Sequence, residues 1–237
     1  MTAKNRPKDA PRRNFYGRRH GQTMNRILHD YLETDLAGLS PGPVSIDENP
    51  DRNPLNLADR FGDRPVWLEI GFGSGEHLAH QAGLHPDVAF IGCEPFVNGV
   101  ATLLGKLRRN DLTNVAVYPD DVRDLFDVLP DRSIDRAFLL YPDPWPKKRH
   151  NRRRFVTSGY LTQLARVLRP GAEFRVATDI ADYVRQTLEQ VPASGFAWQA
   201  ENANDWRQPW SDWVSTRYEQ KALRERRRPH YLTFLRT

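Results

Sequence analysis

The chain has 237 residues, 39% hydrophobic and 27% charged, a composition typical of one folded domain and unlike that of a disordered chain. Its formal net charge of +5 favours an anionic partner such as nucleic acid, and no apolar run approaches the roughly 20 residues that cross a bilayer. The lone Cys93 excludes an internal disulfide and fits a reducing compartment, so we expect a cytoplasmic protein without a metal site.

Residues 1–22 form a basic segment that we expect to be a flexible arm ahead of a single domain over residues 23–237. Its first 20 residues hold seven Lys or Arg against one acid, and Pro7 and Pro11 break any regular element. The arm either contacts phosphates or is only a solubilising tail.

Residues 24–39 have apolar side chains at helical spacing, which predicts one helix packed on the main domain. The stripe consists of Ile27, Leu28, Tyr31, Leu32, Leu36 and Leu39. Prolines and Asx residues then indicate a loop over residues 40–56.

From residue 65 onward, short apolar runs alternate with helical stretches. The five expected strands are residues 66–70, 88–93, 114–118, 134–140 and 172–177. Residues 169–171 form a turn before the fifth, and residues 196–201 and 231–236 supply candidates for two more strands. This alternation predicts an α/β fold with a mostly parallel sheet and helices on both faces.

A glycine-rich loop follows the first expected strand. Gly71, Gly73 and Gly75 allow a tight turn and close approach to a ligand, although a plain strand-to-helix turn is the alternative. A dinucleotide loop needs glycine where Glu76 stands, which argues against NAD. With Glu69 at the strand end, the pattern is similar to motif I of class I methyltransferases, whose cofactor is cationic and tolerates acids.

Acidic residues end the next two expected strands. Glu94 stands where a carboxylate accepts hydrogen bonds from ribose hydroxyls in nucleotide-binding sheets, and a solvated acid is the alternative. After the third strand, the methyltransferase pattern places an acid on the adenine amino group. We favour Asp120 for this contact because Asp121 is placed to cap a helix, but both acids stay open.

The fourth expected strand leads into the segment PDPWPKKRHNRRR. Three prolines stiffen the loop around Asp143 and Trp145, which predicts a preorganised site. Cationic side chains at the start of a helix interact unfavourably with the helix dipole, which disfavours the alternative that the basic residues after this loop are only a solvated helix start. We therefore expect these residues to bind phosphate.

The pieces EIGFGSG, IGCEP, YPDPWPKKRH with NRRR, ATDIADY and STRYE together resemble the bacterial tRNA (guanine-N7-)-methyltransferase family over about residues 60–237. The resemblance implies a Rossmann-like class I methyltransferase fold with a seven-stranded sheet whose last strand is antiparallel. It also implies S-adenosylmethionine as methyl donor and guanosine 46 of the tRNA variable loop as acceptor.

The resemblance further implies roles for individual residues, with Asp143 as the catalytic residue. Cofactor contacts are expected from Glu69, Gly71, Gly73, Gly75, Glu94, Asp120 and Asp143. Substrate contacts are expected from Lys147, Asp179, Thr216, Arg217, Tyr218 and Glu219, and RNA contacts from Lys148, Arg149, Arg152, Arg153 and Arg154. Asp179 is alternatively a helix cap, and the loop of Trp206, Trp210 and Trp213 has no place in the family pattern.

Guanine N7 carries a lone pair and no proton, so its methylation needs positioning more than a strong base. Carboxylates such as Asp143 and Asp179 can stabilise the positive charge that the purine gains. One rival is an enzyme that methylates an exocyclic amine, although a single proline between Asp143 and Trp145 breaks that spacing. Another is an RNA-binding protein with a degenerate pocket. The sequence leaves a monomer and a homodimer both open.

Overall fold

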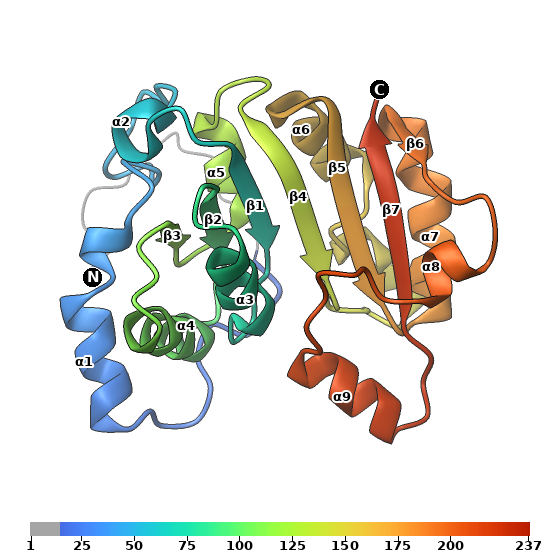
Figure 1. Ribbon diagram of the computed structural model, residues 1–237, viewed down its shortest axis with the longest axis horizontal. Coiled ribbons are helices and arrows are strands. Elements are labelled where there is room, and N and C mark those ends of the chain that lie inside the picture. The colour runs from blue at the N-terminus through green and yellow to red at the C-terminus, as the bar shows by residue number, and fades with distance from the viewer. Residues whose placement is uncertain (1–14) are drawn as a thin grey trace.

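A seven-stranded sheet forms the centre of the molecule, with strand order β3-β2-β1-β4-β5-β7-β6 (Figure 1). The strands are β1 (Val66–Ile70), β2 (Ala89–Cys93), β3 (Val115–Tyr118), β4 (Ile134–Leu140), β5 (Leu168–Thr178), β6 (Phe196–Trp198) and β7 (His230–Arg236). Strands β1 to β5 pair in parallel, whereas β7 is antiparallel to both β5 and β6. The predicted α/β class I methyltransferase fold is confirmed.

This computed structural model describes residues 15–237. Residues 1–14 of the predicted basic arm therefore lie outside the described residues. The rest of that arm, residues 15–22, contacts the domain, where the Asn98 side chain accepts a 2.8 Å hydrogen bond from Gly21 N–H and donates one of 2.8 Å to the Gln22 carbonyl.

Helices cover both faces of the sheet because its inner strands are apolar on both sides. Strands β1, β2 and β3 are buried along their whole length, as is typical of parallel strands between two helical layers. On one face lie α1 (Arg26–Thr34), α3 (Glu76–Leu84) and α4 (Val97–Arg109). On the other lie α5 (Val122–Val128), α6 (Ser158–Val167) and α7 (Ala181–Gln190). The remaining elements are short: η1 (Ala37–Leu39), α2 (Leu57–Phe61), η2 (Lys148–Arg153), η3 (Pro192–Ser194), α8 (Asn204–Arg207) and α9 (Arg217–Arg224).

Two expected elements differ from the structure. The helix expected over residues 24–39 is divided into α1 and η1, and Ile27 of the predicted stripe is 59% exposed. Strand β5 begins before the expected turn because Leu168 already pairs with Ile134, after which the register shifts until Glu173 pairs with Arg136. The turn residues thus form an irregularity inside a longer strand, at a proline that has no N–H to donate.

The tryptophan-rich loop, which the family pattern left unplaced, packs on β7. The rings of Trp210 and Trp213 lie 5.4 and 5.6 Å from the ring of Tyr231, and the Trp210 indole donates a hydrogen bond of 2.9 Å to Thr233 Oγ1. Trp206 stacks on His230 with 5.6 Å between ring centroids. Trp210 and Trp213 therefore cover part of the sheet on the face that carries α3 and α4, whereas Trp206 packs on the opposite face.

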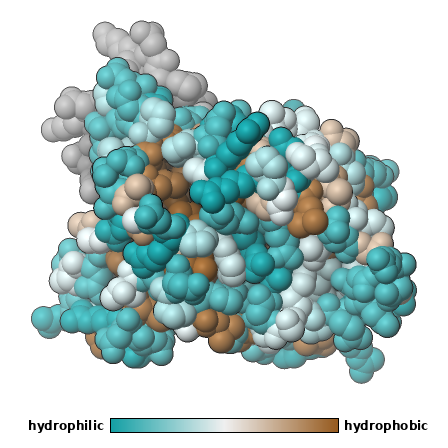
Figure 2. Space-filling view, turned by 45° about the horizontal axis from the view of Figure 1, so that its top comes forward, coloured by the Kyte–Doolittle hydropathy of each residue, from teal (hydrophilic) through white to brown (hydrophobic). Residues whose placement is uncertain are grey.

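The strands β1, β4 and β5 all point their carboxyl ends toward the lower edge of the sheet in Figure 1. The opposite end, turned toward the viewer in Figure 2, is mostly hydrophilic with several hydrophobic patches between the polar residues. Among residues 15–237, no helix is both long enough and apolar enough to cross a bilayer.

Candidate active site

A cavity of about 470 Å³ opens at the carboxyl ends of β1, β2 and β4. Its walls include parts of the glycine loop, the end of β2, the loop after β4 and the start of α9. Seven of the residues selected from the sequence meet there: Gly71, Gly73, Glu94, Asp143, Arg153, Arg217 and Tyr218. Residues from four separate segments therefore share one concave site, at the position where open α/β sheets bind ligands.

The glycine loop needs glycine at Gly73 for two reasons. Its φ is 58°, in the left-handed region, and a Cβ there would lie 2.9 Å from the ring of Tyr218. Gly75 serves the fold instead of the cavity wall, because it precedes α3 and a Cβ there would lie 2.5 Å from Leu103 of α4. Gly75 thus allows α3 and α4 to pack closely behind the loop.

Glu94 joins the end of β2 to the glycine loop. One carboxylate oxygen accepts a 2.8 Å hydrogen bond from the Gly73 N–H, and the other accepts one of 2.8 Å from the Phe96 N–H. Burial raises the pKa of Glu94 to about 7, although both backbone bonds oppose that shift. Since each carboxylate oxygen has two lone pairs, acceptor capacity remains for a ligand in the cavity.

The loop after β4 is held in an unusual conformation. Tyr141 and Trp145 have φ values of 48° and 40°, a region that costs bulky residues free energy. Between them, the exposed Asp143 lines the cavity, and the protein atoms around it raise its pKa above the ordinary value by desolvation. Such a conformation persists only where the surroundings hold it, so the loop's anchors bear directly on the site.

The part of the arm nearest the domain forms a wall of the cavity that the sequence analysis did not assign to the site. Phe15, Tyr16, Gly17 and Arg18 line the cavity. The Arg19 carbonyl accepts a 2.9 Å hydrogen bond from Val97 N–H, and its guanidinium lies 2.7 Å from Asp120. The aromatic residues in the segment FYGRRHG were the available signal, because a solubilising tail has no need of them.

The two acids after β3 have different surroundings. Each acid pairs with an arginine, Asp120 with Arg19 and Asp121 with Arg123, but Asp120 does not line the cavity whereas Asp121 does. Asp121 also caps α5 as expected, because its side chain accepts a 3.0 Å hydrogen bond from Arg123 N–H. The geometry therefore favours Asp121 as the acid nearer a bound ligand, opposite to the sequence-based preference.

Glu69 lies behind the cavity wall. It is 3% exposed, and its carboxylate lies 2.7 Å from Nδ1 of the equally buried His77 on α3. Glu69 therefore joins β1 to α3 beneath the glycine loop, and a direct cofactor contact has no support in this arrangement.

Helix α9 brings two of its four expected substrate residues to the cavity. Arg217 and Tyr218 line it, and the Arg217 guanidinium lies 5.0 Å from the Tyr218 ring. Thr216 is 6% exposed and caps the helix by accepting a hydrogen bond from Glu219 N–H. Thr216 thus serves the helix cap and does not line the cavity, so a substrate contact by Thr216 stays a prediction.

Glu219, the other expected substrate residue, does not line the cavity either, since it is 4% exposed and points into the protein. Three donors converge on its carboxylate: Trp213 Nε1 at 3.0 Å, the Tyr141 hydroxyl at 3.3 Å and the Tyr231 hydroxyl. These donors come from the tryptophan-rich loop, the end of β4 and β7. Glu219 therefore holds α9 against the loop that carries Asp143.

Asp179 and Lys147 lie outside the cavity wall. The Asp179 carboxylate forms an ion pair with Arg227, and its side chain is only 10% exposed. It is not the cap of α7, since Ile180 occupies that position. Lys147 is exposed just before η2.

The basic stretch divides into outward-facing and inward-facing residues. Lys148, Arg149 and Arg152 are exposed on η2. The guanidinium of Arg153 lies in the cavity wall, 4.3 Å from the ring of Tyr16 and 5.0 Å from that of Trp145.

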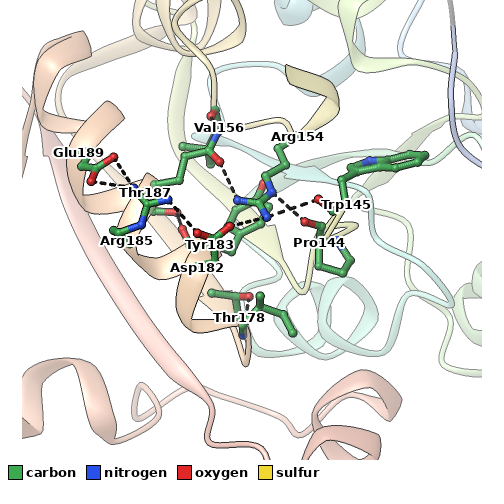
Figure 3. Close-up of polar contacts among 12 residues, drawn as sticks. Pro144, Trp145, Arg154, Val156, Thr178, Asp182, Tyr183, Arg185, Thr187 and Glu189 are labelled. Carbon is green, nitrogen blue, oxygen red and sulfur yellow. Dashed lines mark hydrogen bonds and ion pairs between the residues drawn. The ribbon is translucent and has the colours of Figure 1, made fainter. Parts of the chain in front are cut away.

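The expectation that Arg154 contacts RNA is wrong. Arg154 is 1% exposed and points into the protein toward α7 (Figure 3). Its guanidinium donates to the Pro144 carbonyl, Gln186 Oε1 and Asp182 Oδ2, each at 2.7 Å. These bonds leave it unavailable to a phosphate at the surface.

Among residues 15–237, no cluster of three or more His, Cys, Asp or Glu residues is arranged to hold a metal ion.

Comparisons with known proteins show which proteins the chain is similar to. A family model described as "Putative methyltransferase" matches residues 63–232. The chain is 67% identical over 224 residues to a tRNA (guanine-N(7)-)-methyltransferase from Jannaschia sp. (strain CCS1), covering 94% of each chain. It is 47% identical over 225 residues to a protein of the same name from Agrobacterium fabrum (strain C58 / ATCC 33970), again covering 94% of each.

Among solved structures, the chain is similar to the 16S rRNA methyltransferase KamB, with a TM-score of 0.55 and 17% identity. The match covers 81% of this chain and 94% of that one. At this level of identity the likeness concerns the fold alone.

Proposed function

The chain belongs to the tRNA (guanine-N7-)-methyltransferase family, and we propose that it methylates N7 of a guanosine in tRNA, with guanosine 46 of the variable loop as the acceptor. The observation that carries this proposal is the cavity in which Glu94, Asp143 and the glycine loop meet beside an exposed basic stretch. We place the reaction in the cytoplasm.

The cavity fits S-adenosylmethionine, which supplies an electrophilic methyl group on a sulfonium centre. The cavity volume of about 470 Å³ lies in the range of small-molecule pockets. The glycine loop leaves room for a ligand, because a Cβ at Gly71 would meet no protein atom within 4 Å. Glu94 would accept from the ribose hydroxyls, and Asp121 is the nearer of the two acids that could receive the adenine amino group. We assign Glu69, Gly75 and Asp120 to the support of this pocket.

The chain's own residues act mainly by positioning the guanine. Asp143 offers a carboxylate at the cavity wall that can orient the base and stabilise the positive charge that its ring gains. No base has to remove a proton, because N7 has none at neutral pH. Trp145 and Tyr16 add aromatic faces next to Arg153, and stacking on such faces contributes about 1–3 kcal/mol per base.

The tRNA backbone would meet the exposed residues around η2. Lys147, Lys148, Arg149 and Arg152 are exposed, and Arg153 of the same element reaches the cavity. Phosphate contacts by such residues fix the register of the RNA, while contacts in the cavity select the base. The exposed basic stretch thus lies where it can deliver one nucleotide into the site.

The proposal is tested by incubating the protein with unmodified tRNA and labelled S-adenosylmethionine, followed by nuclease digestion and mass spectrometry of the nucleosides. We expect 7-methylguanosine, and no label in a tRNA whose guanosine 46 is replaced by adenosine. Methyl on adenine would overturn the assignment of the acceptor. Absence of both product and calorimetric heat with the cofactor would instead favour a protein that only binds RNA.

A further inference from the structure

Arg154 is the largest fully buried side chain among residues 15–237, although it ends a basic run in which Lys147, Lys148, Arg149 and Arg152 are exposed. Burying a guanidinium is costly unless every side of it is paired. Its Nε donates to the Pro144 carbonyl, one terminal nitrogen to Gln186 and the other to Asp182, each at 2.7 Å. The Arg154 nitrogen that donates to Asp182, Nη2, also lies 3.5 Å from the Trp145 carbonyl oxygen, a marginal hydrogen bond. The planar fork of an arginine can serve these directions at once, whereas a lysine cannot.

These acceptors belong to two separate parts of the fold (Figure 3). Pro144 and Trp145 directly follow Asp143 in the loop after β4, whereas Asp182 and Gln186 lie one turn apart on α7. Gln186 is itself fixed, because its amide donates a 2.6 Å hydrogen bond to the Val156 carbonyl. The guanidinium therefore connects the Asp143 loop to a helix of the main domain.

The loop has particular need of such a connection. Pro142, Pro144 and Pro146 have no N–H, so the loop cannot be held by a regular backbone ladder. Trp145 has a φ of 40°, which the surroundings must maintain. Because Arg154 takes the carbonyl next to Asp143 and approaches the following one, its position fixes where that carboxylate stands.

We propose that Arg154 is a positioning residue for Asp143 and makes no contact with RNA. This inference rests on the proposed methyl transfer, since it assigns the residue a part in that reaction. It divides the basic stretch into residues that bind tRNA and one that orders the loop beside the cavity.

The first test is Arg154→Lys, which keeps the charge but loses the fork. We expect the single-turnover rate of methyl transfer at saturating tRNA to fall about 100-fold, the effect of a misplaced group near the reacting atoms. The tRNA dissociation constant should stay within about twofold, with an unchanged salt dependence. Arg152→Ala is the contrasting variant, because loss of an exposed cation should weaken tRNA binding and reduce the salt dependence.

Asp182→Ala tests the same connection from the other side and keeps the proposal testable if Arg154→Lys does not fold. It removes an exposed acid, so a purely electrostatic role in RNA binding predicts unchanged or tighter tRNA binding. We expect the methyl-transfer rate to fall in this variant as well, by about tenfold. Arg185→Ala is the matched control, since Arg185 is an exposed partner of Asp182 that does not contact the loop, and its rate should equal that of the wild type.

Hydrogen exchange of residues 141–150 provides a readout that does not depend on activity. We expect faster exchange in this segment for Arg154→Lys and Asp182→Ala than for the wild type and Arg185→Ala. If the wild-type protein produced no 7-methylguanosine, the proposed function would fail, while exchange would still report whether Arg154 orders the loop. The positioning role is overturned if Arg154→Lys keeps its rate within about threefold, or if it loses tRNA affinity with unchanged rate and exchange.

Discussion

The buried carboxylate of Glu219 should be one of the most sensitive positions in the chain. In Glu219→Gln the side chain keeps its size but offers one acceptor oxygen to three donors, so its amide faces at least one of them. Tyr141 and Tyr231 can rotate their hydroxyls to accept from that amide, and the remaining amide oxygen can still accept from the Trp213 indole N–H, which contacts both carboxylate oxygens. A hydrogen bond to a charged acceptor is worth about 1.5–3 kcal/mol against about 0.5–1.5 kcal/mol for a neutral one, so each of the three bonds should weaken by about 1 kcal/mol when the carboxylate becomes an amide. We therefore expect Glu219→Gln to lower the free energy of unfolding by about 3 kcal/mol.

Urea denaturation followed by tryptophan fluorescence measures this change. The midpoint should fall while the slope stays constant, and for a chain of this size the melting temperature should drop by roughly 6–12 °C. Glu189→Gln is the matched control, because Glu189 forms an exposed pair with Arg185 that is worth at most about 1 kcal/mol. A double-mutant cycle with Trp213→Phe should show coupling, since one change weakens and the other removes the same hydrogen bond. A loss below about 0.5 kcal/mol in Glu219→Gln would refute the assignment of Glu219 as a buried anchor.

Three further predictions concern the cavity and its rim. Burial raises the pKa of Glu94 to about 7, and the protonated carboxyl group loses acceptor capacity for the cofactor. Cofactor affinity, measured by calorimetry, should therefore fall about tenfold from about pH 8 to about pH 6. If a Glu94→Gln variant showed the same pH dependence, Glu94 would not be its origin. Asp143→Asn should lower the single-turnover rate at least about 100-fold while filter binding shows tRNA affinity within about twofold, and the reverse pattern would remove Asp143 from catalysis. If the basic residues neutralise about five phosphates, the logarithm of tRNA affinity should fall with the logarithm of salt concentration at a slope of roughly −4. An affinity that does not change with salt would exclude Lys148, Arg149 and Arg152 from the interface.

The sequence was sufficient for the parts of the site that local pattern determines. Apolar runs gave the strands of the sheet, and Glu94 and Asp143 could be placed at one edge because parallel strands end on the same side. The glycine loop followed from the spacing after β1. In each case the residues that fix the position are neighbours in the chain.

The rest depends on partners far away in the sequence. Arg154 looked like its exposed neighbours because nothing in a run of arginines shows that one of them meets Asp182, 28 residues later. Glu219 is fixed by Tyr141, which lies 78 residues earlier, and Asp120 by Arg19 across 101 residues. A charged residue is expected to be exposed to solvent unless a partner for it is known, so a sequence pattern gives the wrong exposure for a charge that is buried and fully paired.

The two buried charges flank the same short loop. Glu219 binds the hydroxyl of Tyr141, two residues before Asp143, and Arg154 binds the carbonyl of Pro144, directly after it. Methylation of a nitrogen that carries no proton gains most from groups whose positions are fixed before the substrate arrives, because reorganisation during the reaction would add to the barrier. A loop with three prolines and two left-handed residues cannot secure itself through backbone hydrogen bonds, so its order must come from side chains outside it. We infer that Glu219 and Arg154 are buried despite the free-energy cost because together they fix the position of Asp143 from both sides of the loop.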